Sequence, residues 1–127
     1  MELFSTTSLY YAFLRAYRGR GKTKEVIRYQ LNLESNLICL HQKILKFEYE
    51  HSSYRHFIVN DSKKRSISAP SFEDHILHHA LYTYLYDIFS PQFIFHSHAN
   101  LKDKGSHRAI KALKSKFHSF DFFMKMD

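Results

Sequence analysis

Asp127 is the residue of this chain whose position most strongly suggests metal chemistry. It follows the apolar run 122–126, which is typical of a buried strand. A carboxylate at the point where a strand leaves the core is suited to holding Mg²⁺ near a phosphate. A two-metal site needs more than one carboxylate, and an aspartate at a strand end also serves to meet solvent. From the residues alone, Asp127 is a candidate metal ligand.

Basic side chains are the second chemical feature. The 127 residues include 19 Lys and Arg against 12 Asp and Glu, a net charge of +7, and 17% of them are aromatic. The basic residues gather in three groups: Arg15, Arg18, Arg20, Lys22, Lys24 and Arg28; Lys63, Lys64 and Arg65; and Lys102, Lys104, Arg108, Lys111, Lys114 and Lys116. Such clustering together with many aromatic rings favours a nucleic-acid partner over solubility alone.

Three histidines, His75, His78 and His79, have the spacing that places them on one helix face. Zinc would need further ligands at tetrahedral geometry, and the candidates Cys39, His41 and His107 have no recognised spacing. We therefore interpret the histidines as a polar and aromatic seam against another helix. In that interpretation each imidazole is hydrogen-bonded to backbone or to a hydroxyl.

Composition limits the class of protein and its compartment. Apolar residues make up 44% of the chain, and the 3 Gly and 2 Pro are too few for a turn-rich β-sandwich, so we expect long helices. Cys39 is the single cysteine, which excludes an internal disulfide and indicates a reducing compartment. No apolar run could span a bilayer, and the residues 1–4 do not resemble a signal peptide. We expect a cytoplasmic protein without a membrane partner.

The hydrophobic pattern predicts an α+β fold that is mainly helical. A short aromatic helix over 5–18 is followed by three main helices at about 22–47, 72–89 and 106–118. The residues expected to face inward from the main helices are Val26, Ile27, Leu31, Leu37, Ile38, Ile44, Leu45, Ile76, Leu77, Ala80, Leu81, Tyr84, Ile88, Ala109, Ile110, Leu113 and Phe117.

Strands and helix caps complete the expected elements. Residues 54–69 read as a β-hairpin with a polar turn, and 121–127 as a final strand that we expect to need neighbours and to favour aggregation or oligomerisation. Ser71 and Asp74 form an approximate capping box for the helix over 72–89. Ser106 is the expected cap of the last helix.

Four blocks occur in order along the chain. They are Arg65-Ser66-Ile67-Ser68-Ala69-Pro70, Asp74-His75-Ile76-Leu77-His78-His79-Ala80-Leu81, Lys104-Gly105-Ser106-His107-Arg108-Ala109 and Met124-Lys125-Met126-Asp127. This order and spacing resembles reverse transcriptases, RNA-directed DNA polymerases, of the group-II-intron-like branch that includes diversity-generating retroelements. The sequence departs from that pattern at His75 and Leu101, where the family usually has Arg, and at Asp103, where it usually has Gly.

The resemblance implies roles for individual residues. Arg65 matches the hairpin arginine that meets the triphosphate of the incoming nucleotide, and either Lys63 or Lys64 supplies a companion lysine. Asp127 matches the first of the aspartates that bind two Mg²⁺ ions in the complete enzyme. The expected nucleic-acid-binding residues are Arg18, Arg20, Lys22, Arg28, Lys102, Lys104, Gly105, His107 and Arg108.

The resemblance also implies how the chain is organised. Residues 1–120 would be the fingers and the start of the palm, and 121–127 the first palm strand, cut off at the first catalytic aspartate. The implied partners are an RNA template, a DNA primer and a deoxynucleoside triphosphate (dNTP). The block with the paired aspartates is not in the sequence. We therefore expect the chain to need a remaining polymerase segment or accessory protein for activity. The alternatives are a non-catalytic RNA-binding module and a protein-interaction remnant.

Overall fold

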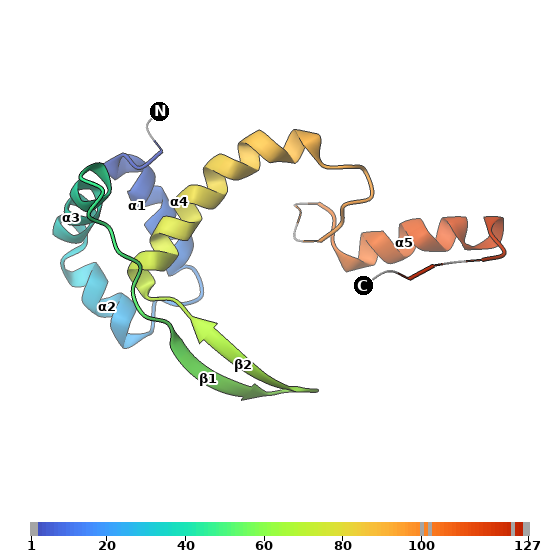
Figure 1. Cartoon of the computed structure of the whole chain (residues 1–127), viewed down its shortest axis with the longest axis horizontal. Helices are drawn as coiled ribbons and strands as arrows, with labels where there is room; N and C mark the ends of the chain where they lie inside the picture. Colours follow the sequence, from blue (N-terminus) through green and yellow to red (C-terminus); the bar gives the residue numbers. More distant parts are fainter. Residues whose placement is uncertain (1–2, 100, 102, 123, 126–127) are drawn as a thin grey trace. The chain divides into compact units, whose positions relative to one another are not determined.

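The computed structural model describes residues 3–99, 101, 103–122, 124 and 125. The chain divides into two compact units, Met1–Ile88 and Phe89–Asp127, and each is described by itself (Figure 1). The described elements combine α-helices with one antiparallel hairpin, which confirms the predicted α+β, mainly helical class. No helix among them has both the length and the apolar character needed to cross a membrane.

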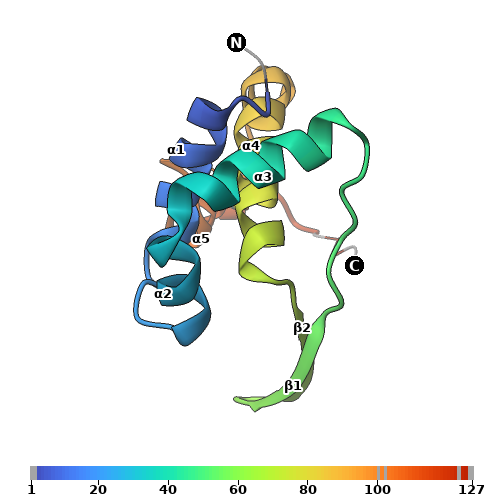
Figure 2. The same ribbon diagram turned by 90° about the vertical axis from the view of Figure 1, so that its left-hand side faces the viewer.

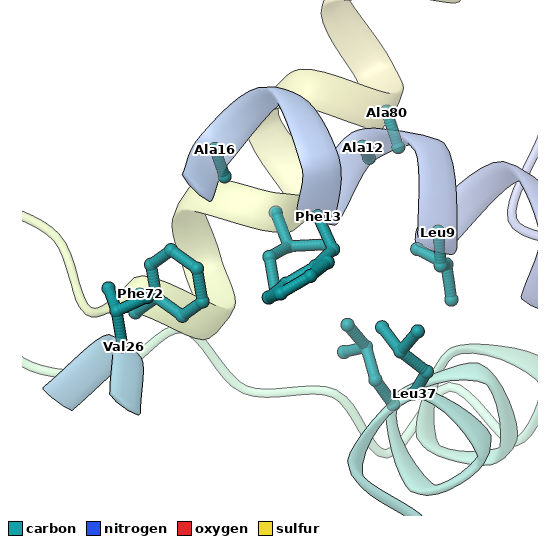
Figure 3. Close-up of a cluster of buried hydrophobic side chains, with 10 residues drawn as sticks. Leu9, Ala12, Phe13, Ala16, Val26, Leu37, Phe72 and Ala80 are labelled. Atoms are coloured by element: carbon teal, nitrogen blue, oxygen red, sulfur yellow. The ribbon is translucent and has the colours of Figure 1, made fainter. Parts of the chain in front are cut away.

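The first unit is built around four helices that surround one apolar core. They are α1 (Thr6–Tyr17), α2 (Lys24–Leu31), α3 (Leu33–Leu45) and α4 (Phe72–Phe89), the last of which runs to the boundary of the unit (Figure 2). The buried residues of α1 recur every three or four positions, so one stripe of that helix faces inward. The core consists of Leu9, Ala12, Phe13, Ala16, Val26, Leu37, Leu40, Phe72, Ile76 and Ala80 (Figure 3).

Aromatic rings join three of these helices. The Phe13 and Phe72 rings meet edge to face at 6.0 Å, and the Tyr29 and Phe72 rings do so at 5.4 Å. These are favourable geometries that add about 0.5–1.5 kcal/mol to the burial of each pair. The side chain of Arg15 also donates a hydrogen bond to the Thr83 hydroxyl, which links α1 to α4.

The prediction of a single helix over 22–47 is wrong in one respect, because the helix is interrupted at Asn32. Asn32 has φ −123° and ψ 39°, so α2 ends and α3 begins there. The side-chain amide of Asn36 donates to the carbonyl oxygen of Tyr29 at 2.9 Å, and the same oxygen accepts from the backbone amide of Asn32 at 3.3 Å. The break separates the inward face of α2 from that of α3. Leu31 and Leu45, predicted to face inward, are mostly exposed: each is the last residue of its helix.

The hairpin confirms the prediction for 54–69. It consists of β1 (Arg55–Asn60) and β2 (Lys64–Ala69), paired antiparallel with Asn60 opposite Lys64, so residues 61–63 form the turn. The predicted helix over 72–89 is confirmed as α4. Its capping box is confirmed too, because the Asp74 amide donates to the Ser71 hydroxyl and the Ser71 amide donates to the Asp74 carboxylate, both at 3.2 Å.

The second unit contains α5 (Ser106–Lys116) and the short 3₁₀ helices η1 (Ser90–Gln92) and η2 (Phe117–Ser119). This confirms the predicted helix over 106–118, but Gly105 rather than Ser106 is its N-cap, with a φ of +97° that suits glycine. The predicted inward stripe is wrong within this unit: Ile110, Leu113 and Phe117 are 63%, 61% and 62% exposed.

The strand predicted over 121–127 is wrong for the residues of that segment that are described, 121, 122, 124 and 125, none of which lies in a strand. A strand needs a neighbour for its backbone hydrogen bonds, and the sheet found in the described part of the chain is the hairpin. Residues 123, 126 and 127 lie outside the described residues.

Candidate nucleic-acid interface

The register of the hairpin decides which of its basic side chains can act together. Side chains alternate between the two faces of a strand, and directly paired residues share a face. Arg65 pairs with Val59, so it lies on the face that also carries Arg55 and Phe57. Lys64 pairs with Asn60 and lies on the opposite face.

Other contacts support these assignments. His56 and Ser68 are paired on the opposite face, and their side chains are hydrogen-bonded at 2.9 Å. Lys63 lies in the turn and belongs to neither strand. The choice between Lys63 and Lys64 as the companion of Arg65 stays open in the sequence, but Lys64 lies across the hairpin from it.

A cavity of about 400 Å³ opens between the start of α2 and the hairpin face that carries Arg55 and Phe57. We call it the basic groove. Its lining is formed by Arg20, Thr23, Lys24, Glu25, Val26, Arg55, Phe57, Ala69 and Phe72. Arg65 does not line the groove, but it lies further along the same hairpin face toward the turn. Three cations and one carboxylate therefore surround the cavity, which gives it a net positive charge.

One aromatic ring provides the groove with a surface for stacking. The Phe57 ring is 42% exposed, and the Arg55 guanidinium lies 5.9 Å from its centre. A half-exposed ring beside cations is the combination that binds unpaired bases together with their phosphates. The groove can therefore accommodate both parts of a nucleotide.

The one carboxylate of the groove is committed to the fold. A carboxylate oxygen of Glu25 accepts a hydrogen bond from the backbone amide of Phe72 at 2.7 Å. Phe72 opens α4, so Glu25 satisfies one of the free amides at that helix N-terminus. This contact ties α2 to α4 and fixes one wall of the groove.

Asp74 is hydrogen-bonded to the segment that precedes β1 and to the segment that follows β2. Its side chain is 0% exposed and accepts hydrogen bonds from the Tyr49 hydroxyl, the Ser52 amide at 3.4 Å and the Ser71 hydroxyl at 2.6 Å. Tyr49 and Ser52 precede β1, whereas Ser71 follows β2. Both chain segments that lead into the hairpin are thus fastened to the first turn of α4.

This network also sets the protonation state of Asp74. Burial by itself raises the pKa of the carboxyl group. The hydrogen bonds from Ser71, Tyr49 and the Ser52 amide outweigh burial, with help from His51 at 3.9 Å, and the pKa lies below its usual value of 3.8. Burial and the bond to Asp74 raise the pKa of Tyr49, so its hydroxyl stays protonated as a donor.

The histidines of α4 lie close together, as predicted. The His75 ring is 5.5 Å from that of His79 and 6.4 Å from that of His78. The hydrogen bonds that we expected are not all formed, because Nδ1 of His75 is buried without a partner. Burial lowers the pKa of His75 and His79, and the nearby arginines of α1 and the following loop lower it further. Among the described residues, no group of three His, Cys, Asp or Glu side chains could hold a metal ion.

The predicted nucleic-acid-binding residues of the first unit separate into two places. Arg20 lines the basic groove, whereas Arg28 lines a different pocket between α2 and α3. Arg18 and Lys22 are exposed in the connection between α1 and α2 and line neither cavity. This connection turns at Gly21, where a Cβ atom would approach the Tyr17 ring to 2.4 Å.

The predicted residues of the second unit serve mainly in its own local structure. Nζ of Lys104 donates to the carbonyl oxygen of Phe95 at 2.9 Å, and the Arg108 guanidinium donates to that of Asp103 at 2.7 Å. Gly105 is the N-cap of α5, and His107 is exposed on its first turn. The predicted residues Lys102 and Asp127 lie outside the described residues.

Sequence analysis placed Lys24 in the first basic group but not among the expected nucleic-acid-binding residues, and it missed Arg55 and Phe57 of the basic groove. The alternation in β1 could have identified Arg55 and Phe57, because both lie an even number of positions from Val59, the partner of Arg65. A larger cavity of about 610 Å³ lies between α1 and α3, but Glu34 is the one charged residue in its lining, so it does not suit phosphate. Comparison of the sequence with family models and with curated proteins finds no match.

Proposed function

We propose that this chain is the template- and nucleotide-gripping part of an RNA-directed DNA polymerase, and that its basic groove binds the phosphates of nucleic acid. The observation that carries the proposal is the convergence of Arg20, Lys24 and Arg55 on one cavity beside the exposed Phe57 ring. The four sequence blocks that resemble reverse transcriptases support the choice of polymerase.

In this proposal the hairpin face defines how the ligand is held. Arg65 and Arg55 lie on the same face, with Arg65 paired to Val59 four positions along the strand from Arg55, so their guanidinium groups can contact separate phosphates as forks. Phe57 offers its ring to a base. The Asp74 network keeps the hairpin fixed relative to α4, which holds these groups in place before the ligand arrives.

The catalytic step is proposed for the complete polymerase, in which a primer hydroxyl attacks the α-phosphate of a dNTP. Mg²⁺ would stabilise the charge on the attacking and leaving oxygens when bound. Asp127 would supply one metal ligand, and the sequence has no paired-aspartate block to supply the others. The isolated chain is therefore inactive in primer extension, and template-dependent synthesis by it would contradict this part of the proposal.

Binding of single-stranded RNA across a series of salt concentrations tests the groove. Each phosphate contact lowers the logarithm of the affinity by about 0.7 per tenfold increase in salt, so Arg20→Gln and Arg55→Gln should each reduce that slope by ~0.7. Lys46→Gln is the matched control, because Lys46 is exposed at the end of α3 and lines neither the basic groove nor the α2–α3 pocket.

Three results are distinguished by this titration. RNA binding with the expected slopes supports the basic groove, and both the polymerase reading and the non-catalytic RNA-binding module predict it. An absence of RNA binding at low salt favours the protein-interaction remnant and overturns the proposal. Equal loss in the control variant shows that net charge, rather than the groove, determines the affinity.

A further inference from the structure

A second pocket lies beside the basic groove, at the break between α2 and α3. Its volume is about 430 Å³, and we call it the α2–α3 pocket. Its lining is formed by Lys24, Glu25, Arg28, Tyr29, Asn32 and Asn36. Four of these residues follow one another at intervals of four, so the kink at Asn32 brings a row of polar side chains to one opening.

The cations of this pocket have no acidic partner among the described residues. The ion pairs among the described residues join Lys43 to Glu73 and His51 to Asp74. Neither pair includes Lys24 or Arg28. Glu25 is the one carboxylate in the lining, and it accepts the Phe72 amide at 2.7 Å. The pocket therefore offers positive charge to a ligand from outside.

The amide side chains add hydrogen-bonding groups without charge. The Asn36 side chain donates to the Tyr29 carbonyl oxygen at 2.9 Å, which fixes its position at the pocket wall. Asn32 makes no side-chain capping bond to α3, so its amide is not committed to the helix that it precedes. Two cations with side-chain amides form a set that contacts phosphate oxygens in nucleic-acid complexes.

The two cavities are neighbours at the first turn of α2, because Lys24 and Glu25 line both. A ligand that fills both must be extended and carry repeated negative charge. We propose that the α2–α3 pocket is a second seat for the phosphodiester backbone of a single-stranded RNA whose neighbouring nucleotides occupy the basic groove. This inference rests on the proposed function and extends it to Arg28, Asn32 and Asn36.

The experiment compares Asn32→Asp with Ser35→Asp in the full chain. Both variants add one negative charge near the start of α3, but Ser35 does not line the pocket. Aspartate is as good an N-cap as asparagine, and acidic groups suit a helix N-terminus, so both variants should fold. Urea denaturation, which measures the free energy of unfolding, checks that both variants fold.

The probes are labelled oligouridines of increasing length. We expect Asn32→Asp to weaken binding of long oligouridine about fivefold and to leave the shortest oligouridine that still binds unaffected, whereas Ser35→Asp changes neither. Arg28→Gln should reduce the salt slope for the long probe by ~0.7. Unchanged binding of the long probe by Asn32→Asp, or equal losses for both lengths or both aspartate variants, would overturn the second seat.

Failure of the second seat and failure of the proposed function give different results. In the first case the wild-type chain binds RNA and Arg20→Gln weakens both probes, but Asn32→Asp has no effect that depends on length. In the second case the wild-type chain binds neither probe, and the α2–α3 pocket is overturned along with the basic groove.

Discussion

Removing the carboxylate of Asp74 is expected to destabilise the first unit and loosen the hairpin. The side chain is fully buried and accepts from Tyr49, Ser52 and Ser71. Loss of the carboxylate that completes the capping box with Ser71 costs about 1 kcal/mol. A partly buried Tyr49 hydroxyl left without its partner costs about 1–3 kcal/mol more. We therefore expect Asp74→Ala to reduce the free energy of unfolding by ~3 kcal/mol.

Urea denaturation measures this change, and Asp87→Ala is the matched control because Asp87 lies exposed on the same helix. The control should stay within about 0.5 kcal/mol of the wild type. Amide hydrogen exchange in Asp74→Ala should accelerate in β1 and β2 more than in α1, since both ends of the hairpin are released. A change below about 1 kcal/mol, or unchanged exchange in the hairpin, would refute the clamping role.

The acid dependence of stability follows from the same carboxylate. Its pKa is lower in the folded chain than the ordinary 3.8 of the unfolded chain. As the pH falls through 3.8, the unfolded chain therefore binds a proton at Asp74 before the folded chain does. The stability that the ionised Asp74 contributes is lost as the pH falls toward the pKa of the folded chain. The wild-type chain should lose stability below about pH 4, and Asp74→Ala should lose less over the same range.

Three further results are expected from urea denaturation. Gly21→Ala should destabilise the chain by about 1–3 kcal/mol because its Cβ meets the Tyr17 ring, and Tyr17→Leu should relieve part of that cost. The pKa of His79 in the folded chain lies below the ordinary 6.5, so as the pH falls the unfolded chain binds a proton at this residue before the folded chain does. Stability should therefore fall as the pH drops below 6.5, and His79→Gln should weaken that pH dependence. Leu40→Ala should cost about 2–5 kcal/mol, whereas Leu113→Gln should cost less than ~0.5 kcal/mol because that side chain is exposed; equal effects would contradict the assigned core.

Local sequence signals were sufficient for most of the elements. The β-rich segment before a polar turn predicted the hairpin, and Ser71 with Asp74 predicted the start of α4. These features depend on residues within a few positions of each other. The break at Asn32 was not predicted, because the apolar spacing continues through it and no Gly or Pro marks the position.

Long-range features of the site could not be read from the sequence. Asp74 was predicted as a cap, but its contacts with Tyr49 and Ser52 join residues 25 and 22 positions apart. Arg20 and Arg28 were grouped as neighbours in the sequence, yet they line different cavities: Arg20 lies before α2 and lines the basic groove, whereas Arg28 lies within α2 and lines the α2–α3 pocket. The periodicity of apolar residues indicates which face of a helix or strand is buried, but it does not indicate which other element that face contacts.

Hydrogen exchange of the full chain with and without single-stranded RNA tests the central claim most directly, since it locates the bound strand without any substitution. We predict slower exchange in β1, β2 and the residues 18–28, and unchanged exchange along the α1–α3 cavity that Glu34 and Tyr10 line. Protection of the α1–α3 cavity with none in the hairpin would contradict the account.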